Sequence, residues 1–424
     1  MAKKSLIGKA YDIAVEQFGE LGVDVAAAEK KLLDIPLSIQ CWQGDDVGGF
    51  EHAGEPASLG DGLAVTGNYP GKARTPAELR ADIEKVLSYV PGKNRIALHA
   101  SYAEFEGGKF VDRDAISVRH FANWIAWAKE KGVGLDFNPT FFSHPKVKGG
   151  CTLSSPDKAI RTFWIEHGIR SREISRAIGR ELGSSVLNNF WIPDGSKDTP
   201  ADRLAPRRRL EEALDACFEK KYPAAQTVES VESKLFGMGC ESYTVGSHEF
   251  YMGYAVSRGK FICLDSGHFH PTEVISDKLT AIVDFVPGIA LHVSRPVRWD
   301  SDHVVTLNDE TLRIASELVW NGLLPKTRIG LDYFDASINR VAAWTIGARN
   351  FRKALLIALL TPDCARKAEE KGDYTARLAI QEDFRMLPFG AVWNGFCEKN
   401  GVLPDGAWMF DCKDYEKNVT SKRG

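Results

Sequence analysis

The sequence has no long apolar run and no excess of basic residues. No stretch approaches the roughly 20 apolar residues of a membrane-spanning helix, so we expect no membrane partner. The chain of 424 residues carries a net charge of −3. Proteins that bind nucleic acid usually show a basic footprint, so nucleic acid is not an expected partner. Low-complexity segments are absent too, and nothing repeats beyond the spacing of the apolar runs described below.

Paired cysteines are also missing. The eight cysteines are scattered and form no CxxC pair, which argues against a zinc–thiolate site. Asp12, Glu16 and Glu20 interrupt the apolar core that a secretory signal would need near the N-terminus. Unpaired thiols in a chain of this size are typical of a reducing compartment, so we expect a cytoplasmic protein.

What the sequence does have is eight short apolar runs separated by helical patterns such as residues 75–89, 120–131 and 205–219. Such runs are typical of buried parallel strands, and their alternation with helices predicts βα units. Eight units favour closure into a (β/α)8 TIM barrel over an open sheet. The runs are residues 36–42, 95–99, 133–138, 185–191, 228–235, 261–265, 289–293 and 328–334.

Helices are predicted on both sides of the barrel in sequence. We expect an N-terminal helical segment (1–34, with one helix over 4–33), a catalytic barrel (35–345) and an all-helical C-terminal extension (346–424). The predicted C-terminal helices are residues 339–360, 374–387 and 389–399. The extension is a candidate for subunit contacts, but its aromatic residues Trp344, Phe389, Trp393 and Phe396 could equally pack back on the barrel.

Four successive runs carry Glu232, Asp265, His292 and Asp332 at or near their C-terminal ends. All strands of such a barrel point these ends at one face, where chemistry occurs. Three carboxylates and one histidine there suggest a cage for a divalent metal. For Asp332 the alternative is an Arg or Lys partner in the core, since a lone buried carboxylate is costly.

Further chemistry-bearing residues lie nearby. Lys234 shares a strand face with Glu232 and could deliver a proton or hold a substrate oxygen, or form a structural ion pair. His268 follows Asp265 at an offset that suits two adjacent metals, or is a core histidine. Asp300 and Asp302 offer two hard oxygen ligands, or form a solvated acidic turn.

Aromatic strand ends complete the predicted mouth of the barrel. Trp42, Phe137 and Trp191 could wall a sugar pocket, with His99, Asn138 and Asp194 as polar contacts. The alternative for each aromatic residue is ordinary core packing. The residues thus predict a metal site beside a pocket for a small polar substrate.

Long stretches of the chain resemble the L-rhamnose isomerase family, in its bacterial cytosolic form. The resemblance spans essentially the whole chain and is highly specific. The matching stretches are residues 41–46, 66–74, 134–139, 191–195, 231–237, 267–273, 293–303 and 330–340.

The resemblance implies a homotetrameric (β/α)8 enzyme that interconverts L-rhamnose and L-rhamnulose. It implies two divalent ions per subunit, typically Mn²⁺, with Mg²⁺, Co²⁺ or Zn²⁺ as alternatives. Glu232, Asp265, His292 and Asp332 would hold the structural metal. His268, Asp300 and Asp302 would hold the catalytic one, with Glu232 the carboxylate to be shared. We therefore expect Lys234, His268, Asp300 and Asp302 to be catalytic, and the sugar contacts to be Trp42, His99, Phe137, Trp191, Asp265 and Asp332.

Two mechanisms and three other functions stay open at this point. Isomerisation can proceed by a hydride shift from C2 to C1 assisted by metal, or through a cis-enediol formed by a carboxylate base. The chain could isomerise another aldose. A metal-dependent hydrolase would need basic groups for phosphate, and a sugar-binding barrel without catalysis would keep metals for stability alone.

Overall fold

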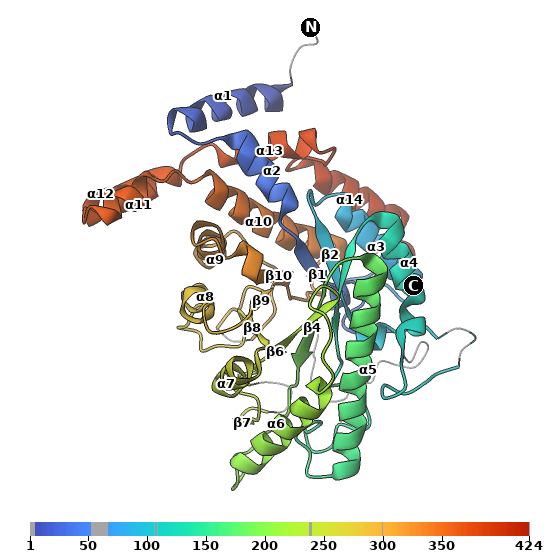
Figure 1. The fold of residues 1–424 in the computed structure, drawn as a ribbon. Coiled ribbons are helices and arrows are strands. Elements are labelled where there is room, and N and C mark those ends of the chain that lie inside the picture. The colour runs from blue at the N-terminus through green and yellow to red at the C-terminus, as the bar shows by residue number, and fades with distance from the viewer. Residues whose placement is uncertain are drawn as a thin grey trace.

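Eight parallel strands close into a barrel, as the sequence predicts (Figure 1). This computed structural model describes residues 5–51, 67–105, 107, 109–236, 240–298 and 300–423; Thr66, Gly237 and Trp299 of the matching stretches lie outside the described residues. Neighbouring strands follow the order β1-β10-β9-β8-β6-β4-β3-β2, and β1 pairs with β10 to close the ring. The strands are β1 (Leu37–Gln40), β2 (Asn94–His99), β3 (Gly134–Asn138), β4 (Val186–Trp191), β6 (Thr227–Glu232), β8 (Phe261–Asp265), β9 (Ile289–Val293) and β10 (Thr327–Leu331).

Helices surround the barrel and bury the outward face of each strand. On β3, Leu135 and Phe137 face the helices and are fully buried, while Asp136 and Asn138 point into the barrel. The main core therefore lies between strands and helices. The surrounding helices are α3 (Pro76–Leu87), α4 (Ala122–Lys131), α5 (Lys158–Leu182), α6 (Leu204–Phe218), α7 (His248–Arg258), α8 (Ser276–Ile282), α9 (Asp309–Trp320) and α10 (Arg340–Leu360).

The N-terminal segment forms two helices, α1 (Leu6–Glu20) and α2 (Val25–Asp34), so the prediction of one helix over residues 4–33 is wrong. Gly22 has a φ of +76°, a conformation that glycine adopts without strain and that ends α1. Asp24 then accepts a hydrogen bond from the Ala27 backbone N–H at 2.9 Å and caps α2.

The C-terminal extension is helical, as predicted, but it has more helices than the sequence indicated. The four helices after α10 are α11 (Cys364–Glu370), α12 (Tyr374–Phe384), α13 (Phe389–Lys399) and α14 (Ala407–Asn418). The sequence missed α11 and α14, and a short antiparallel pair, β5 (Gly195–Ser196) with β7 (Tyr243–Thr244). The predicted boundary between residues 345 and 346 falls inside α10, which packs against α9 and α3 and is the eighth helix of the barrel.

The N-terminal helices pack against α13 of the C-terminal extension (Figure 1). Phe18 of α1 contacts Phe389 of α13 with ring centroids 5.4 Å apart, and Lys399 pairs with Glu29 of α2 at 2.9 Å. Trp344, Trp393 and Phe396 are each 1% exposed within the single chain. Of the two alternatives for these aromatic residues, packing back within the chain is therefore correct. None of the described helices has the length and apolar character needed to cross a membrane.

Candidate metal and sugar site

Four ligand-type side chains meet where β6, β8, β9 and β10 end. Glu232 and Asp265 are the last residues of their strands, His292 is one residue from its strand end, and Asp332 directly follows β10. His292 Nδ1 lies 3.0 Å from Asp332 Oδ2 and 3.2 Å from Glu232 Oε1. One ligand atom from each of the four lies within 4.8 Å of the others, a spacing that one cation could bridge. The structure therefore brings the four predicted side chains together.

A second group shares the same cavity. Ligand atoms of Asp265, His268 and Asp300 also lie within 4.8 Å of one another. His268 Nδ1 is 3.3 Å from Glu232 Oε1, and its Nε2 is 3.3 Å from Asp300 Oδ2. Lys234 Nζ contacts the same Asp300 oxygen. The Asp300 side chain is only 6% exposed, so it is not part of a solvated turn.

Asp302 lines this cavity but is not in the group around His268, where Asp265 takes the place predicted for it. Its φ is +43°, in the left-handed region that a non-glycine residue rarely occupies. Its carbonyl oxygen accepts a hydrogen bond from the Phe334 N–H at 3.3 Å. A strained residue beside a cluster of ligands supports a functional constraint on this position.

Negative charge is concentrated in the cavity. Burial, with Glu232, Asp300 and Asp332 nearby, raises the pKa of Asp265 to about 7. Burial likewise raises the pKa of Asp302, aided by its acidic neighbours. Burial opposes ionisation of Glu232, but the charges and hydrogen bonds of His292 and His268 hold its pKa below the usual range. Carboxylates packed this closely repel one another, and a divalent cation relieves that repulsion.

Buried atoms without hydrogen-bond partners also indicate that a cation binds here. Oδ1 of Asp300 and Oδ1 of Asp332 are buried and have no hydrogen-bond partner among the described residues. Such atoms are costly unless something binds them. Carboxylate oxygen with imidazole nitrogen is a donor set that suits Mn²⁺, Mg²⁺ or Zn²⁺. The residues present fit a divalent metal centre.

Asn189 positions the central carboxylate and was missed by the sequence reasoning. Its side-chain amide donates to Glu232 Oε2, and its oxygen accepts a hydrogen bond from Ser230 Oγ at 2.6 Å. These two hydrogen bonds, from Ser230 to Asn189 and from Asn189 to Glu232, fix the orientation of the Glu232 carboxylate. Strand alternation could have found Asn189, because it shares the inward face of β4 with Trp191.

Aromatic rings form part of the wall of the cavity. Trp42 stacks on His99 with centroids 4.3 Å apart, and Trp191 lies parallel to His268 at 6.2 Å. The indole N–H groups of both tryptophans and both ring nitrogens of His99 are buried without partners among the described residues. Burial lowers the pKa of His99 to about 3, so its ring is neutral near pH 7. Apolar ring faces beside unused donors and a neutral imidazole suit a polyhydroxylated ligand.

Comparisons with known proteins agree with this geometry. The sequence profile of the L-rhamnose isomerase (RhaA) family matches residues 5–423. The L-rhamnose isomerase of Listeria innocua serovar 6a is 55% identical over 424 residues, covering 100% of both chains. That of Rhodopirellula baltica is 54% identical and covers 100% of this chain and 98% of its own. The chain belongs to the L-rhamnose isomerase family.

Solved structures with similar folds are more distant. An L-ribulose 3-epimerase has 13% sequence identity and a TM-score of 0.45, covering 73% of this chain and 98% of its own. A D-allulose 3-epimerase from Methylomonas sp. has 14% identity and a TM-score of 0.43, covering 69% and 97%. Full-length identity within the L-rhamnose isomerase family, together with the buried ligand cluster, identifies the chain as an aldose–ketose isomerase.

Two expected sugar contacts are not brought to the cavity. The Phe137 ring points out of the barrel and packs edge-on against Phe121 at 5.1 Å, because its position on β3 faces the helices. Asp194 accepts hydrogen bonds from Thr152 and Ser154 and joins two loops. Phe334 instead lines the cavity, edge-on to Trp42 at 5.8 Å. The sequence could have indicated this role, because Phe334 is the last residue of the predicted eighth run and the strand ends meet at the site.

Proposed function

We propose that this chain interconverts L-rhamnose and L-rhamnulose with two divalent cations, Mn²⁺ first among them. The observation that carries the proposal is the overlap of two buried ligand groups. The same Glu232 oxygen, Oε1, lies 3.2 Å from His292 and 3.3 Å from His268, which supports its sharing between two cations. Glu232, Asp265, His292 and Asp332 would hold one ion. His268, Asp300 and Asp302 would hold the other.

When bound, the cations supply Lewis acidity that polarises the C1 carbonyl of the open-chain aldose and favours a C2-to-C1 hydride shift. Lys234 is the residue placed to act on the developing charge. Burial opposes its ionisation, but Asp300 raises the pKa of its ammonium group, so it stays charged. We propose that Lys234 donates a hydrogen bond to O1 as negative charge grows there.

Other side chains bind and orient the sugar. Trp42, Trp191 and Phe334 would cover its apolar faces and exclude water, which suits direct hydrogen transfer within the substrate. His99, being neutral, would exchange hydrogen bonds with a hydroxyl group without adding charge. Among the described residues that line the cavity, Lys234 is the sole Lys or Arg, which disfavours a phosphoester substrate.

Turnover of L-rhamnose by metal-stripped protein, with and without added Mn²⁺, tests the function. We expect activity only with metal. Activity equal in both conditions would contradict the metal role, and no turnover in either would redirect the search to other aldoses.

L-rhamnose deuterated at C2 separates the two mechanisms. A hydride shift keeps the label at C1 of the product, as read by NMR. Extensive loss of deuterium to water would instead support the cis-enediol route, in which a carboxylate removes the C2 proton.

We also propose that the chain forms a homotetramer in the cytoplasm, with the barrel as catalytic domain and the helical extension after it as the source of subunit contacts. All eight cysteines are free thiols, as a reducing compartment favours. The arm formed by α11 and α12 projects from the molecule (Figure 1), and Tyr374, Leu378 and Met386 on or beside it are 63%, 56% and 87% exposed. Apolar side chains on a projecting arm support a contact with another subunit.

A further inference from the structure

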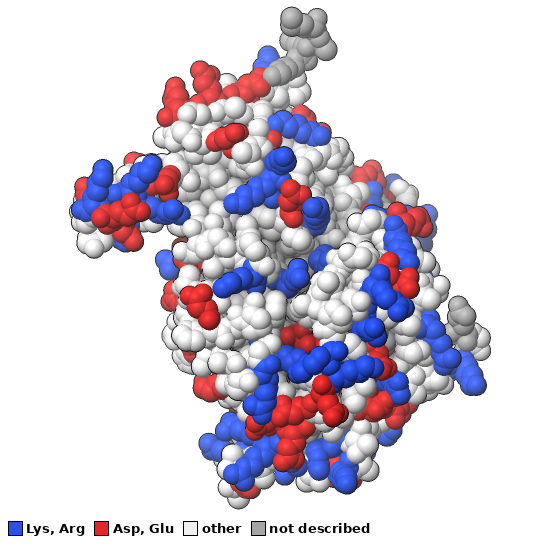
Figure 2. Space-filling view, in the orientation of Figure 1, with Lys and Arg blue, Asp and Glu red and all other residues white. Residues whose placement is uncertain are grey.

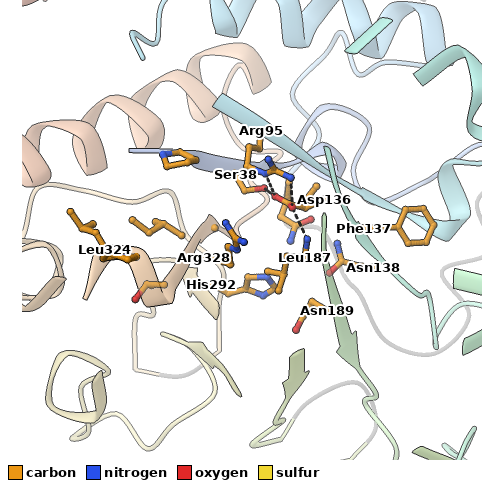
Figure 3. Close-up of a pocket in the computed structure, with 17 residues that line it drawn as sticks. Ser38, Arg95, Asp136, Phe137, Asn138, Leu187, Asn189, His292, Leu324 and Arg328 are labelled. Carbon is orange, nitrogen blue, oxygen red and sulfur yellow. Dashed lines mark hydrogen bonds and ion pairs between the residues drawn. The ribbon is translucent and has the colours of Figure 1, made fainter. Parts of the chain in front are cut away.

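A cavity lies inside the barrel on the N-terminal side of the metal and sugar site, and Figure 3 shows the residues that line it. We call it the lower barrel cavity; its volume is about 240 Å³. Pro36, Leu324 and Pro325 line its outer end, and they precede β1 and β10, so this end lies at the N-terminal face of the barrel. Asn138, Asn189 and His292 line its upper end and also line the metal and sugar site.

The cavity exists because inward-facing positions carry small side chains. In most such barrels, bulky branched residues fill this space. Here Ser38, Ala97 and Gly330 occupy inward positions on β1, β2 and β10. A Cβ atom on Gly330 would lie 2.8 Å from the Leu291 carbonyl oxygen and 3.2 Å from His292 Cδ2, so a side chain does not fit there.

The charge of the cavity is positive. Asp136 accepts hydrogen bonds from Arg95, Ser38 and the Leu187 N–H, at 2.8–2.9 Å. Arg95 gives its other donors to Ser184 and to backbone carbonyl groups, so these two opposite charges satisfy each other. Arg328 has no hydrogen bond or ion pair within the described part of the chain, although it lines the same cavity.

Arg328 is therefore a half-buried cation that no described residue contacts as a hydrogen-bonded or ion-paired partner. Burial lowers the pKa of Arg328, although the charge of Asp136, which is already hydrogen-bonded to Arg95, acts in the opposite direction. Gln40, also in the lining, is 3% exposed, and its side-chain oxygen has no hydrogen-bond partner among the described residues. Its side-chain NH₂ group makes no hydrogen bond within the described residues and can donate to a ligand in the cavity. The cavity thus offers one positive charge without a bound partner and one amide donor, a combination that suits a small anion.

We propose that the lower barrel cavity binds one small monovalent anion, such as chloride, against the Arg328 guanidinium group. The positive charge of Arg95 and the negative charge of Asp136 neutralise each other, which leaves the single positive charge of Arg328. A monovalent anion balances that charge. The outer end between Pro36 and Leu324 gives it a route that does not pass through the metal and sugar site. The proposal does not depend on the isomerase reaction, and its tests do not measure activity.

Crystals of the full chain soaked in sodium bromide test the proposal directly. We expect an anomalous peak in hydrogen-bond contact with Arg328 inside the barrel, because bromide replaces chloride and scatters anomalously. Ordered water alone in the cavity, or bromide confined to the molecular surface, would overturn the proposal.

A solution measurement provides the second test. Thermal unfolding is followed while sodium bromide replaces sodium gluconate at constant ionic strength. At ten times the dissociation constant, a bound anion raises Tm by about 2 °C. Arg328→Gln should lose this rise, whereas Arg180→Gln, which removes a 63% exposed charge on α5, should keep it. An equal rise in Arg328→Gln and wild type would refute the site. Arg328→Lys, which retains the charge, should keep part of the rise, and the bromide soak decides the proposal if the glutamine variant does not fold.

Discussion

At the scale of single residues, the charge balance of the metal and sugar site depends on Lys234. It is 5% exposed and contacts Asp300, one of the ligand-type carboxylates. A buried ammonium group can offset carboxylate charge and also meet charge that develops on a substrate. Its position two residues after Glu232 places both side chains in one cavity.

We expect Lys234→Met to lower kcat by about 10²- to 10³-fold, the usual cost of losing one donor to a developing oxyanion. KM should change little, because the interaction strengthens as the charge appears. Steady-state kinetics at saturating Mn²⁺ measure both constants. Lys129→Met, which removes an exposed lysine of α4, is the control. A fall in kcat of less than threefold would contradict the role assigned to Lys234.

A second prediction at this scale concerns acid stability. His167 on α5 accepts a hydrogen bond from the Thr140 N–H at 3.0 Å, and burial lowers its pKa to about 3. Below about pH 6.5 the His167 side chain binds a proton in the unfolded chain but stays neutral in the folded chain. The free energy of unfolding therefore falls as the pH falls. From pH 7 to pH 5 this one group costs about 2 kcal/mol.

Urea unfolding at both pH values measures this cost. The difference in unfolding free energy between pH 7 and pH 5 should be about 2 kcal/mol smaller in His167→Gln than in wild type. His270→Gln, which alters an exposed histidine, should keep the wild-type difference. The same difference in all three proteins would show that folding does not lower the pKa of His167.

At the scale of elements, α10 joins the N-terminal helices to the barrel. Its Arg352 is fully buried and donates to the carbonyl oxygens of Leu32, Ile35 and Lys93. One side chain thereby connects α2 and the starts of β1 and β2. Such a residue supplies partners that the backbone of these connections cannot find within a helix or strand.

We expect Arg352→Met to lower the unfolding free energy by about 3 kcal/mol or more, because buried carbonyl groups lose their donors. The variant should keep its kcat when folded, since Arg352 does not line the cavity of the metal and sugar site. Urea denaturation and kinetics at low temperature separate the two effects. Arg366→Met on α11 serves as the exposed control. A loss of less than 1 kcal/mol would mean that water replaces the guanidinium group.

At the scale of the whole molecule, the arm of α11 and α12 contrasts with the rest of the extension. Figure 2 shows mixed positive and negative charge on the projecting arm. No residue of α12 is buried, whereas α13 buries Val392, Trp393 and Phe396. The arm therefore contributes little to the core of one chain, and a role between chains accounts for its exposed apolar residues.

Leu378→Glu tests that role. Light scattering should give four times the chain mass of 46.9 kDa for wild type and a smaller assembly for the variant, because a charge would be buried at the contact. Leu6→Glu, at an 83% exposed position on α1, should leave the assembly unchanged. An unaltered mass in Leu378→Glu would exclude this part of the arm from the contact.

The sequence by itself determined the barrel and the ligand residues at its strand ends. Apolar runs in alternation with helices leave few packing solutions, and the C-terminal ends of parallel strands meet at one face. Glu232, Asp265, His292 and Asp332 could therefore be grouped before any coordinates were known. The family resemblance then supplied the substrate, which strand patterns cannot specify.

Only the tertiary structure decided which side chains face which cavity. Phe137 was expected to line the mouth, but pleating turns its ring toward α4, and a shift of one residue along a strand reverses the face. The same alternation along β4 turns Asn189 into the barrel, whereas Phe334 reaches the cavity from the segment after β10. The unpaired charge of Arg328 depends on which partners reach Arg95 and Asp136, and those partners come from four strands and the loop before β4. The spacing of residues along the sequence predicts local strands and helices. Contacts such as these depend on how segments distant in the sequence pack against one another.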